Sequence, residues 1–243
     1  MEYGLQLYSI RDITKENLDG ALEKVARLGY KTVEFAGFFD HSAAAVQEML
    51  QKHSLRLIGT HSSFKELVED FEGTLAFHKE LGNKYYIIPG YKLPNQTALD
   101  EFVALVNSIS KKLEKEGISL CFHNHAKEFL PTEDGVQVYD QLLYRTNLLL
   151  EVDAYWAFVG MKDPIKLMDR VSDRLRLMHI KDGFADGSGM PLGKGEAPVE
   201  EMWKWAKAHQ IPMIVESETL TPDGITEAQI CIDYLRFIEE KNK

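Results

Sequence analysis

The sequence has only two cysteines in 243 residues, Cys121 and Cys231, and both lie in apolar segments without CxxC spacing. A disulfide framework requires several paired cysteines, and a zinc knuckle requires closely spaced ones. This pattern excludes both and is typical of buried, reduced thiols. We therefore expect a cytoplasmic protein.

The sequence also lacks long hydrophobic runs and an excess of positive charge. No stretch approaches the ~20 apolar residues that a membrane-spanning helix requires, and the N-terminal segment MEYGLQLYSIRD is charged where a signal peptide would be apolar. Lysine and arginine number 28 against 38 aspartates and glutamates, which gives a net charge of -10. Such a surface repels polyphosphate. We therefore expect neither a membrane nor a nucleic acid as a partner.

What the sequence does contain is a regular alternation of short apolar runs and longer segments of helical periodicity, typical of βα units around a parallel sheet. Eight runs begin near Tyr3, Lys31, Leu55, Lys84, Ile118, Leu148, Leu175 and Ile211. Their spacing of roughly 30 residues matches one βα repeat. A doubly wound sheet would need a glycine-rich turn after the first strand, where the sequence reads LYSIRD. We predict an α/β fold, a single (β/α)8 TIM barrel domain over residues 1–243.

The predicted helices have recognisable ends and faces. Gly29, Gly82 and Gly117 each follow a segment of helical periodicity, where a left-handed residue commonly ends a helix. The final helix, from about Thr226, places Phe237 among the apolar residues that we expect to be buried. Three histidines on predicted helices are expected at the solvent surface: His53, His78 and His209.

Ionisable residues follow seven of the eight predicted strands. In such a barrel the loops after the strands converge on one pocket, so these positions are the candidates for chemistry. They are Arg11, Glu34, His61, His123 with His125, Asp153, His179 with Lys181, and Glu216. The strand interiors before them are otherwise apolar. Buried charge is costly unless it is paired, hydrogen-bonded or bound to metal, so the clustering indicates a ligand.

Three consecutive strands end in a potential metal ligand at the same level: Asp153, His179 and Glu216. His123 on the adjacent strand would complete the set, although His125 or Glu128 could take its place. Two imidazoles and two carboxylates would balance a divalent cation. This mixed set suits Mn, Co, Zn or Fe(II) better than Ca, and Mg only with retained water. We predict one divalent metal ion, without specifying its identity.

Other residues near these strand ends can contact a small polar substrate. Trp156 could offer a flat apolar face to a sugar ring, and Lys181 and Arg11 could bind oxyanions or hydroxyl groups. The predicted substrate contacts are Arg11, His125, Glu128 and Trp156. No convincing phosphate cradle is present, so the sequence does not decide whether the substrate is phosphorylated.

Several short motifs occur in a specific order: HNH at 123–125 with EF at 128–129, LEVDAYW at 150–156, HIKD at 179–182, GKGE at 193–196 and VESE at 215–218. With these motifs in this order, the chain resembles the sugar-phosphate isomerase/epimerase superfamily along its whole length. These xylose isomerase-like TIM barrels include ketose 3-epimerases, inosose dehydratases and an apurinic endonuclease. The resemblance implies that Asp153, His179 and Glu216 bind metal and that Glu34, His61 and Lys181 face the substrate.

One position departs from the superfamily's epimerases. They usually place a glutamate at the end of strand five, where it binds metal and acts as one of two opposed acid/base carboxylates. His123 matches that position here, so the two-glutamate mechanism does not carry over directly. The HNH form is more similar to the inosose dehydratase side of the superfamily.

The expected activity is that of a metal-dependent sugar or polyol isomerase/epimerase, which abstracts a proton next to a carbonyl through a metal-stabilised enediolate. Glu216 is the candidate base, with Glu34, His61 and Lys181 as further catalytic residues. Epimerisation, isomerisation and dehydration share this first step, so a lyase of inosose-dehydratase type is the alternative. The partner would be a small sugar, keto-sugar or polyol, and a homo-oligomer is compatible with the sequence.

Two further alternatives are less favoured. A hydrolase of the apurinic endonuclease type would need additional ligands for a three-metal cluster, but Ile88, Pro89 and Gly90 end the fourth strand without a histidine. The negative charge also argues against a DNA substrate. A sugar-binding barrel without enzymatic activity would need no metal and would exchange no substrate protons with solvent.

Overall fold

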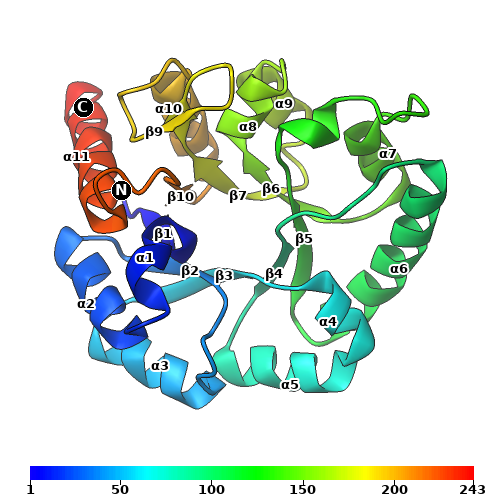
Figure 1. Ribbon diagram of the computed structural model, residues 1–243, viewed down its shortest axis with the longest axis horizontal. Helices are drawn as coiled ribbons and strands as arrows, with labels where there is room; N and C mark the ends of the chain where they lie inside the picture. The colour runs from blue at the N-terminus through cyan, green and yellow to red at the C-terminus, as the bar shows by residue number, and fades with distance from the viewer.

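The computed structural model describes residues 1–243 and confirms the predicted α/β barrel. Eight parallel strands close in the order β1-β10-β7-β6-β5-β4-β3-β2. They are β1 Gly4–Gln6, β2 Thr32–Ala36, β3 Arg56–His61, β4 Tyr85–Ile88, β5 Ser119–His123, β6 Leu149–Asp153, β7 Leu175–Ile180 and β10 Met213–Val215. Figure 1 shows these strands at the centre of a ring of helices.

Each barrel strand begins within two residues of its predicted position. The largest difference is in β10, which begins at Met213 instead of Ile211. The intervening Pro212 has no amide hydrogen to donate to a neighbouring strand. Pairing of Leu5 with Val215 closes the barrel, and pairing of Asp153 with His179 places two predicted metal ligands side by side.

Eleven α-helices surround the barrel, eight of them in the outer ring that the fold requires. These eight are α2 Leu18–Leu28, α3 Ala43–Lys52, α5 Phe71–Leu81, α6 Gln96–Lys115, α7 Val138–Arg145, α9 Pro164–Arg170, α10 Val199–His209 and α11 Gly224–Lys241. Three short helices in the loops after β1, β3 and β6 are additional: α1 Arg11–Thr14, α4 Phe64–Glu69 and α8 Ala154–Val159. None of the helices combines the length and the apolar character needed to cross a membrane.

Smaller elements complete the loops at the carboxyl ends of the strands. Two 3-10 turns, η1 Leu7–Ile10 and η2 Ala126–Phe129, follow β1 and β5. A short antiparallel pair, β8 Asp182–Gly183 and β9 Gly189–Met190, follows β7. The Asp182 carboxylate accepts hydrogen bonds from four backbone amides, including those of Gly193 and Gly195 at 2.9 and 3.0 Å. One buried side chain thereby fixes the shape of the loop that carries the GKGE motif.

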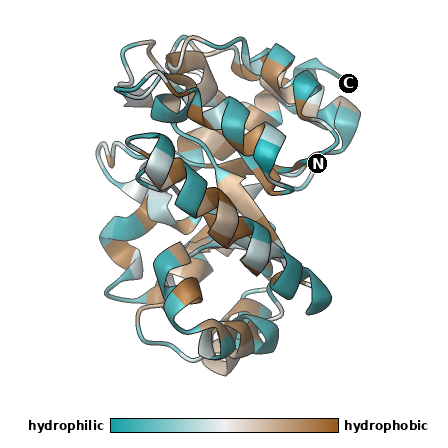
Figure 2. Cartoon of the chain, turned by 90° about the vertical axis from the view of Figure 1, so that its right-hand side faces the viewer, coloured by the Kyte–Doolittle hydropathy of each residue, from teal (hydrophilic) through white to brown (hydrophobic).

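Hydrophobic side chains fill two separate regions. The larger region lies between the strands and the helices, and Figure 2 shows hydrophilic residues on the outer sides of those helices. A small cluster of Ile87, Cys121, Leu177 and Ile214 fills the barrel interior. Because side chains alternate along a strand, Cys121 and Leu177 point to the same side as His123 and His179, two residues further on. The polar strand ends therefore rest on an apolar layer.

The predicted helix ends are confirmed at the three glycines. Gly29, Gly82 and Gly117 have φ angles of 100°, 74° and 77°, in the left-handed region. Gly29 and Gly82 directly follow the last residues of α2 and α5. An L-residue at these positions would be strained, which is why glycine ends these helices.

Two helical side chains differ from the predictions. Phe237 on α11 is 60% exposed, because the buried stripe of this helix passes through Leu235 and Ile238 and Phe237 lies about 100° away from Ile238. His78, expected at the surface, is only 4% exposed and packs 4.8 Å from the ring of Tyr86. Burial lowers the pKa of His78 to about 4, so its ring is neutral near pH 7.

Candidate active site

The carboxyl ends of the strands surround a cavity of about 370 Å³. It is lined by Tyr8, Ala36, His61, Pro89, His123, His125, Glu216 and Glu218. This lining contains three imidazoles and two carboxylates, and neither lysine nor arginine is part of it. Larger cavities of about 520 and 580 Å³ lie among the surrounding loops. Of the ionisable strand-end residues, only His61 lines either of these larger cavities.

Four predicted residues come together at this cavity, and we call them the first cluster: His123 of β5, Asp153 of β6, His179 of β7 and Glu216, which follows β10. His123 Nε2 lies 3.5 Å from Asp153 Oδ2. His179 Nδ1 lies 3.3 Å from Glu216 Oε2 and 4.0 Å from Asp153 Oδ2. All four side chains are buried. The structure therefore brings the predicted metal ligands to one place.

The first cluster has the spacing and chemistry of a metal site. Ligand atoms about 2.1 Å from one ion lie roughly 3.0 to 3.5 Å from each other. Three pairs of the first cluster are 3.3 to 4.0 Å apart, and all four ligand atoms lie within 4.8 Å of one another. Both ring nitrogens of His123 and the Oδ2 of Asp153 are buried without a hydrogen-bond partner, which is uncommon for polar atoms. Burial lowers the pKa of His123 well below its ordinary value, so the ring is neutral and can donate a lone pair.

Local structure fixes the orientation of Asp153. Its Oδ1 accepts the backbone N–H of Trp156 at 2.8 Å and caps helix α8, which leaves Oδ2 to the first cluster. Asn124, the middle residue of the HNH motif, donates to the Asp153 carbonyl at 3.1 Å and accepts from its N–H at 3.2 Å. Burial raises the pKa of Asp153 to about 7, a cost that a bound cation would offset.

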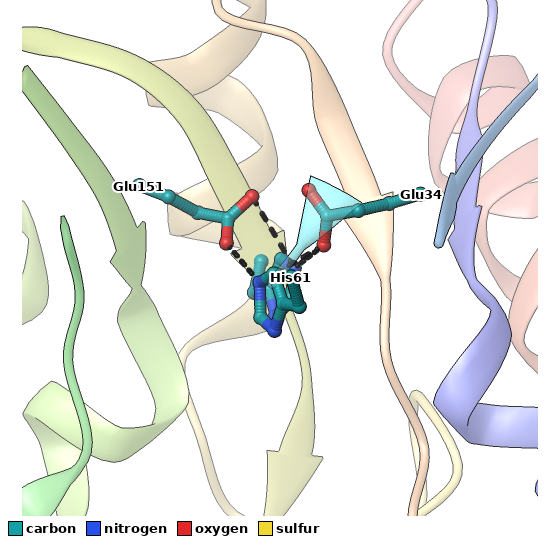
Figure 3. A group of neighbouring side chains, drawn as sticks. Glu34, His61 and Glu151 are labelled. Atoms are coloured by element: carbon teal, nitrogen blue, oxygen red, sulfur yellow. Dashed lines mark hydrogen bonds and ion pairs between the residues drawn. The ribbon is translucent and has the colours of Figure 1, made fainter. Parts of the chain in front are cut away.

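A second cluster lies against the first and shares His179 with it: Glu34 of β2, His61 of β3, Glu151 of β6 and His179. Figure 3 shows His61 beside the carboxylates of Glu34 and Glu151. His61 Nε2 lies 2.6 Å from Glu151 Oε2 and 3.1 Å from Glu34 Oε1. His179 Nε2 lies 2.8 Å from Glu34 Oε1 and 3.4 Å from Glu151 Oε1.

The shortest separations in the second cluster are those of hydrogen bonds, and they are too short for two ligands of one ion. Glu34 Oε1 also accepts a hydrogen bond from Gln6 Nε2 at 2.6 Å. Burial, followed by the charge of Glu151, raises the pKa of Glu34 to about 7. Gly59 leaves room for this carboxylate, because a Cβ there would lie 3.2 Å from Glu34 Oε2. We therefore interpret the second cluster as a hydrogen-bonded network.

His179 joins the two clusters through opposite ring nitrogens. Its Nε2 is directed at Glu34 and its Nδ1 at Glu216. In the tautomer with hydrogen on Nε2, this nitrogen donates to Glu34 and Nδ1 keeps its lone pair for the first cluster. A carboxylate behind an imidazole ligand typically fixes the tautomer and orientation of that ligand in this way.

The prediction that the strand interiors are apolar was wrong in β6, and β1 also ends in a buried polar side chain. Glu151 and Gln6 are both fully buried within the barrel. Strand periodicity could have identified Glu151, because it precedes Asp153 by two residues and so points to the same face. Glu218 was not among the predicted site residues, although it is part of the VESE motif and lines the cavity.

Lys181 is buried among carboxylates. Its Nζ lies 2.6 Å from Glu218 Oε2, 3.0 Å from Glu216 Oε2 and 3.7 Å from Asp153 Oδ2. Burial alone would lower the pKa of Lys181, but these carboxylates, Glu216 foremost, raise it above its ordinary value. The ammonium group is therefore charged and already paired, and it lies 5.1 Å from the ring of Trp156.

The four predicted substrate contacts are placed differently from one another. His125 lines the cavity, and the ring of Trp156 lies 5.8 Å from it. Burial lowers the pKa of His125 to about 4. The Glu128 carboxylate does not line the cavity but accepts the backbone N–H of His125 at 2.8 Å. Arg11 is also outside the lining, with both terminal nitrogens donating to backbone carbonyls.

Comparisons with known proteins extend this description. The profile of a family described as Xylose isomerase-like TIM barrel matches residues 22–240. The inosose dehydratase of Geobacillus kaustophilus is 23% identical over 189 residues, which are 68% of this chain. The match spans only 61% of that protein's length.

Solved structures show the same fold. A sugar phosphate isomerase/epimerase from Parabacteroides distasonis is 27% identical, with a TM-score of 0.80 and coverage of 96% of this chain and 97% of that one. A D-allulose 3-epimerase from Methylomonas sp. is 16% identical, with a TM-score of 0.71 and coverage of 98% of both chains. At that identity the likeness concerns the fold alone.

Proposed function

The chain belongs to the xylose isomerase-like TIM barrel family, and on that premise we propose that it is a metal-dependent isomerase or epimerase of a sugar or polyol. The observation that carries the proposal is the first cluster. Its four ligand-type side chains have metal-like spacing and adjoin a cavity of about 370 Å³, large enough for a monosaccharide. We expect His123, Asp153, His179 and Glu216 to hold one divalent ion. When bound, this ion would polarise a substrate carbonyl and its neighbouring hydroxyl group.

In this proposal Glu216 takes the proton from the carbon next to the carbonyl. Burial opposes its ionisation, but the ammonium group of Lys181 foremost lowers the pKa of Glu216 well below its ordinary value, so Glu216 is ionised, the state that can accept a proton. Lys181 Nζ, 3.0 Å from Glu216 Oε2, holds that carboxylate in place. The substrate lies in the cavity that Glu216 lines.

His61 is the candidate to return a proton to the substrate. It lines the cavity, and its Nε2 is held by Glu151 at 2.6 Å. Glu34 is fully buried behind His61 and His179, so we assign it the role of positioning these two rings rather than contacting the substrate. His125, which lines the cavity, and Trp156 beside it would orient the sugar.

A dehydratase is the second candidate. It is supported by His123 at the strand-five position, where the epimerases of this superfamily usually carry a glutamate, and by the match to an inosose dehydratase. Both reactions begin with loss of a proton next to a carbonyl. They differ in whether a proton returns to carbon or a hydroxyl group leaves.

Hydrogen exchange tests the shared first step. Metal-loaded protein in deuterated water should introduce deuterium next to the carbonyl of a free ketose or keto-inositol, and Glu216→Gln should abolish this exchange. Among active substrates, an epimer or an aldose–ketose pair supports the isomerase, whereas loss of water supports the dehydratase. A protein that binds metal but exchanges no hydrogen in a broad panel of such compounds would refute the proposed function.

A further inference from the structure

Two cations, Lys181 and Arg11, lie beside the cavity, and neither is part of its lining. Lys181 Nζ lies 2.6 Å from Glu218 Oε2 and 3.0 Å from Glu216 Oε2. Arg11 donates from Nη1 to the Tyr8 carbonyl at 2.9 Å and from Nη2 to the Glu218 carbonyl at 2.7 Å. A phosphate group binds where cationic or amide donors are free to reach it. Lys181 is paired with two carboxylates, and Arg11, which keeps further N–H donors, lies outside the cavity lining.

Glu218 is held in a fixed position at the cavity. It lies in the segment after β10, where the buried carboxylate of Glu227 accepts hydrogen bonds from the Ser217 hydroxyl at 2.7 Å, the Thr219 hydroxyl and the Thr221 amide at 2.8 Å. The guanidinium of Arg11 holds the Glu218 carbonyl from the other side. The Glu218 side chain is 32% exposed and lines the cavity. A negative charge is thereby built into the cavity wall.

Outside the two clusters, the unpartnered polar groups beside the cavity are neutral. His125 Nδ1 and Trp156 Nε1 are buried without a hydrogen-bond partner, and both are suited to a hydroxyl group. The nearest cation beyond those already engaged is Lys127, which lines the neighbouring cavity and whose Nζ lies 3.7 Å from Glu128 Oε1. The site therefore offers neutral hydrogen-bonding groups and two carboxylates to an incoming ligand.

We propose that the substrate is an uncharged polyhydroxy carbonyl compound and that Glu218 makes the pocket reject its phosphate ester. This inference rests on the proposed function, because it specifies which sugar derivative the same site accepts. The Glu218 carboxylate accepts hydrogen bonds from hydroxyl groups, repels a phosphate and occupies the ammonium group of Lys181. Removing its charge takes away one of the two carboxylates that accept a hydrogen bond from Lys181 and relieves the repulsion, so an anionic ligand gains from both changes.

The experiment measures binding to the metal-loaded protein by calorimetry or ligand-observed NMR. The probes are D-fructose, D-allulose, their 6-phosphates, a keto-inositol and inorganic phosphate. We expect an uncharged sugar to bind at least about tenfold more tightly than the phosphate esters. In Glu218→Gln this preference should decrease by about tenfold. Glu116→Gln is the matched control, because it removes an exposed carboxylate paired with Lys79 outside the cavity lining and should leave the preference unchanged.

Each other outcome overturns the inference in a recognisable way. If a 6-phosphate binds the wild type as tightly as its free ketose or more tightly, the inference fails while the proposed function stands. Loss of that phosphate binding in Lys127→Gln would then locate the anion at the rim of the cavity. An unchanged preference in Glu218→Gln, with native circular dichroism, removes Glu218 from the explanation. If no sugar or ester binds at all, the proposed function fails together with the inference.

Discussion

The two clusters at the carboxyl ends of the strands use the same residue types in different ways. Each contains histidines and two carboxylates, and they share His179. In the first cluster the closest pairs are 3.3 to 4.0 Å apart, and three polar atoms have no partner. In the second cluster the closest pairs are 2.6 to 3.1 Å apart and bonded to each other. Spacing, not composition, distinguishes the candidate metal site from the hydrogen-bonded cluster beside it.

This difference also predicts which cluster binds the metal ion and which one supports it. In the second cluster each side chain takes part in a close pair, although Glu34 Oε2 and Glu151 Oε1 are buried without a partner. In the first cluster His123 has no hydrogen-bond partner on either ring nitrogen, and Asp153 Oδ2 has none. Glu34 and Glu151 hold the imidazoles of His61 and His179 from behind. Changes in the first cluster should therefore remove metal binding, and changes in the second should weaken it.

The largest effect is expected from His123. His123→Ala removes a ligand-type nitrogen of the first cluster, and we expect metal affinity to fall by about a hundredfold. His125→Ala is the matched control and should change the affinity by less than about threefold, because His125 belongs to neither cluster. Metal analysis after chelation and reloading, with titration of each variant, measures both. The reverse order of effects would make His125 the strand-five ligand.

An intermediate effect is expected from Glu34. Glu34→Gln removes the carboxylate that accepts a hydrogen bond from His179 Nε2 at 2.8 Å. We expect metal affinity to fall by roughly tenfold, with about one ion still bound at saturation, because the variant disturbs only the orientation of a ligand. The same titration measures this. A wild type that binds two ions, one of which Glu34→Gln loses, would show that the second cluster is itself a metal site.

A change of His78 should have no effect on the metal site, because His78 lies outside both clusters. Its pKa is about 4 in the folded protein and near 6.5 in the unfolded chain. The unfolded chain therefore binds the proton first as the pH falls. The contribution of His78 to stability should be constant above about pH 6.5 and should decrease by about 3 kcal/mol by pH 4.

His78→Gln should remove this part of the pH dependence and leave metal affinity unchanged. Urea unfolding at several pH values measures the slope of the free energy of unfolding for the wild type and the variant. Identical slopes would mean that acid destabilises the protein elsewhere. The ionisable residues of the two clusters would then be the next candidates for the cause of the acid destabilisation.

The sequence predicted the parts of the fold that depend on local patterns. The eight strands, the glycines after α2 and α5, and the four residues of the first cluster could all be identified from periodicity and position. The exposure of Phe237 could not be predicted, because a helix with several apolar residues has more than one candidate stripe. The choice depends on which side of α11 meets the barrel.

The sequence by itself determined that ionisable side chains would meet at one end of a barrel, because strand spacing and period-two alternation fix where each strand ends and which side chains point inward. Only the tertiary structure decided how those side chains are divided. Lys181 and Glu218 are 37 residues apart in sequence, and Glu34 and His179 are 145 apart. Such groups pair with each other, turn toward a ligand or remain unsatisfied. The outcome depends on differences of a few tenths of an ångström in the distances across the closed barrel. Local sequence patterns do not specify those distances.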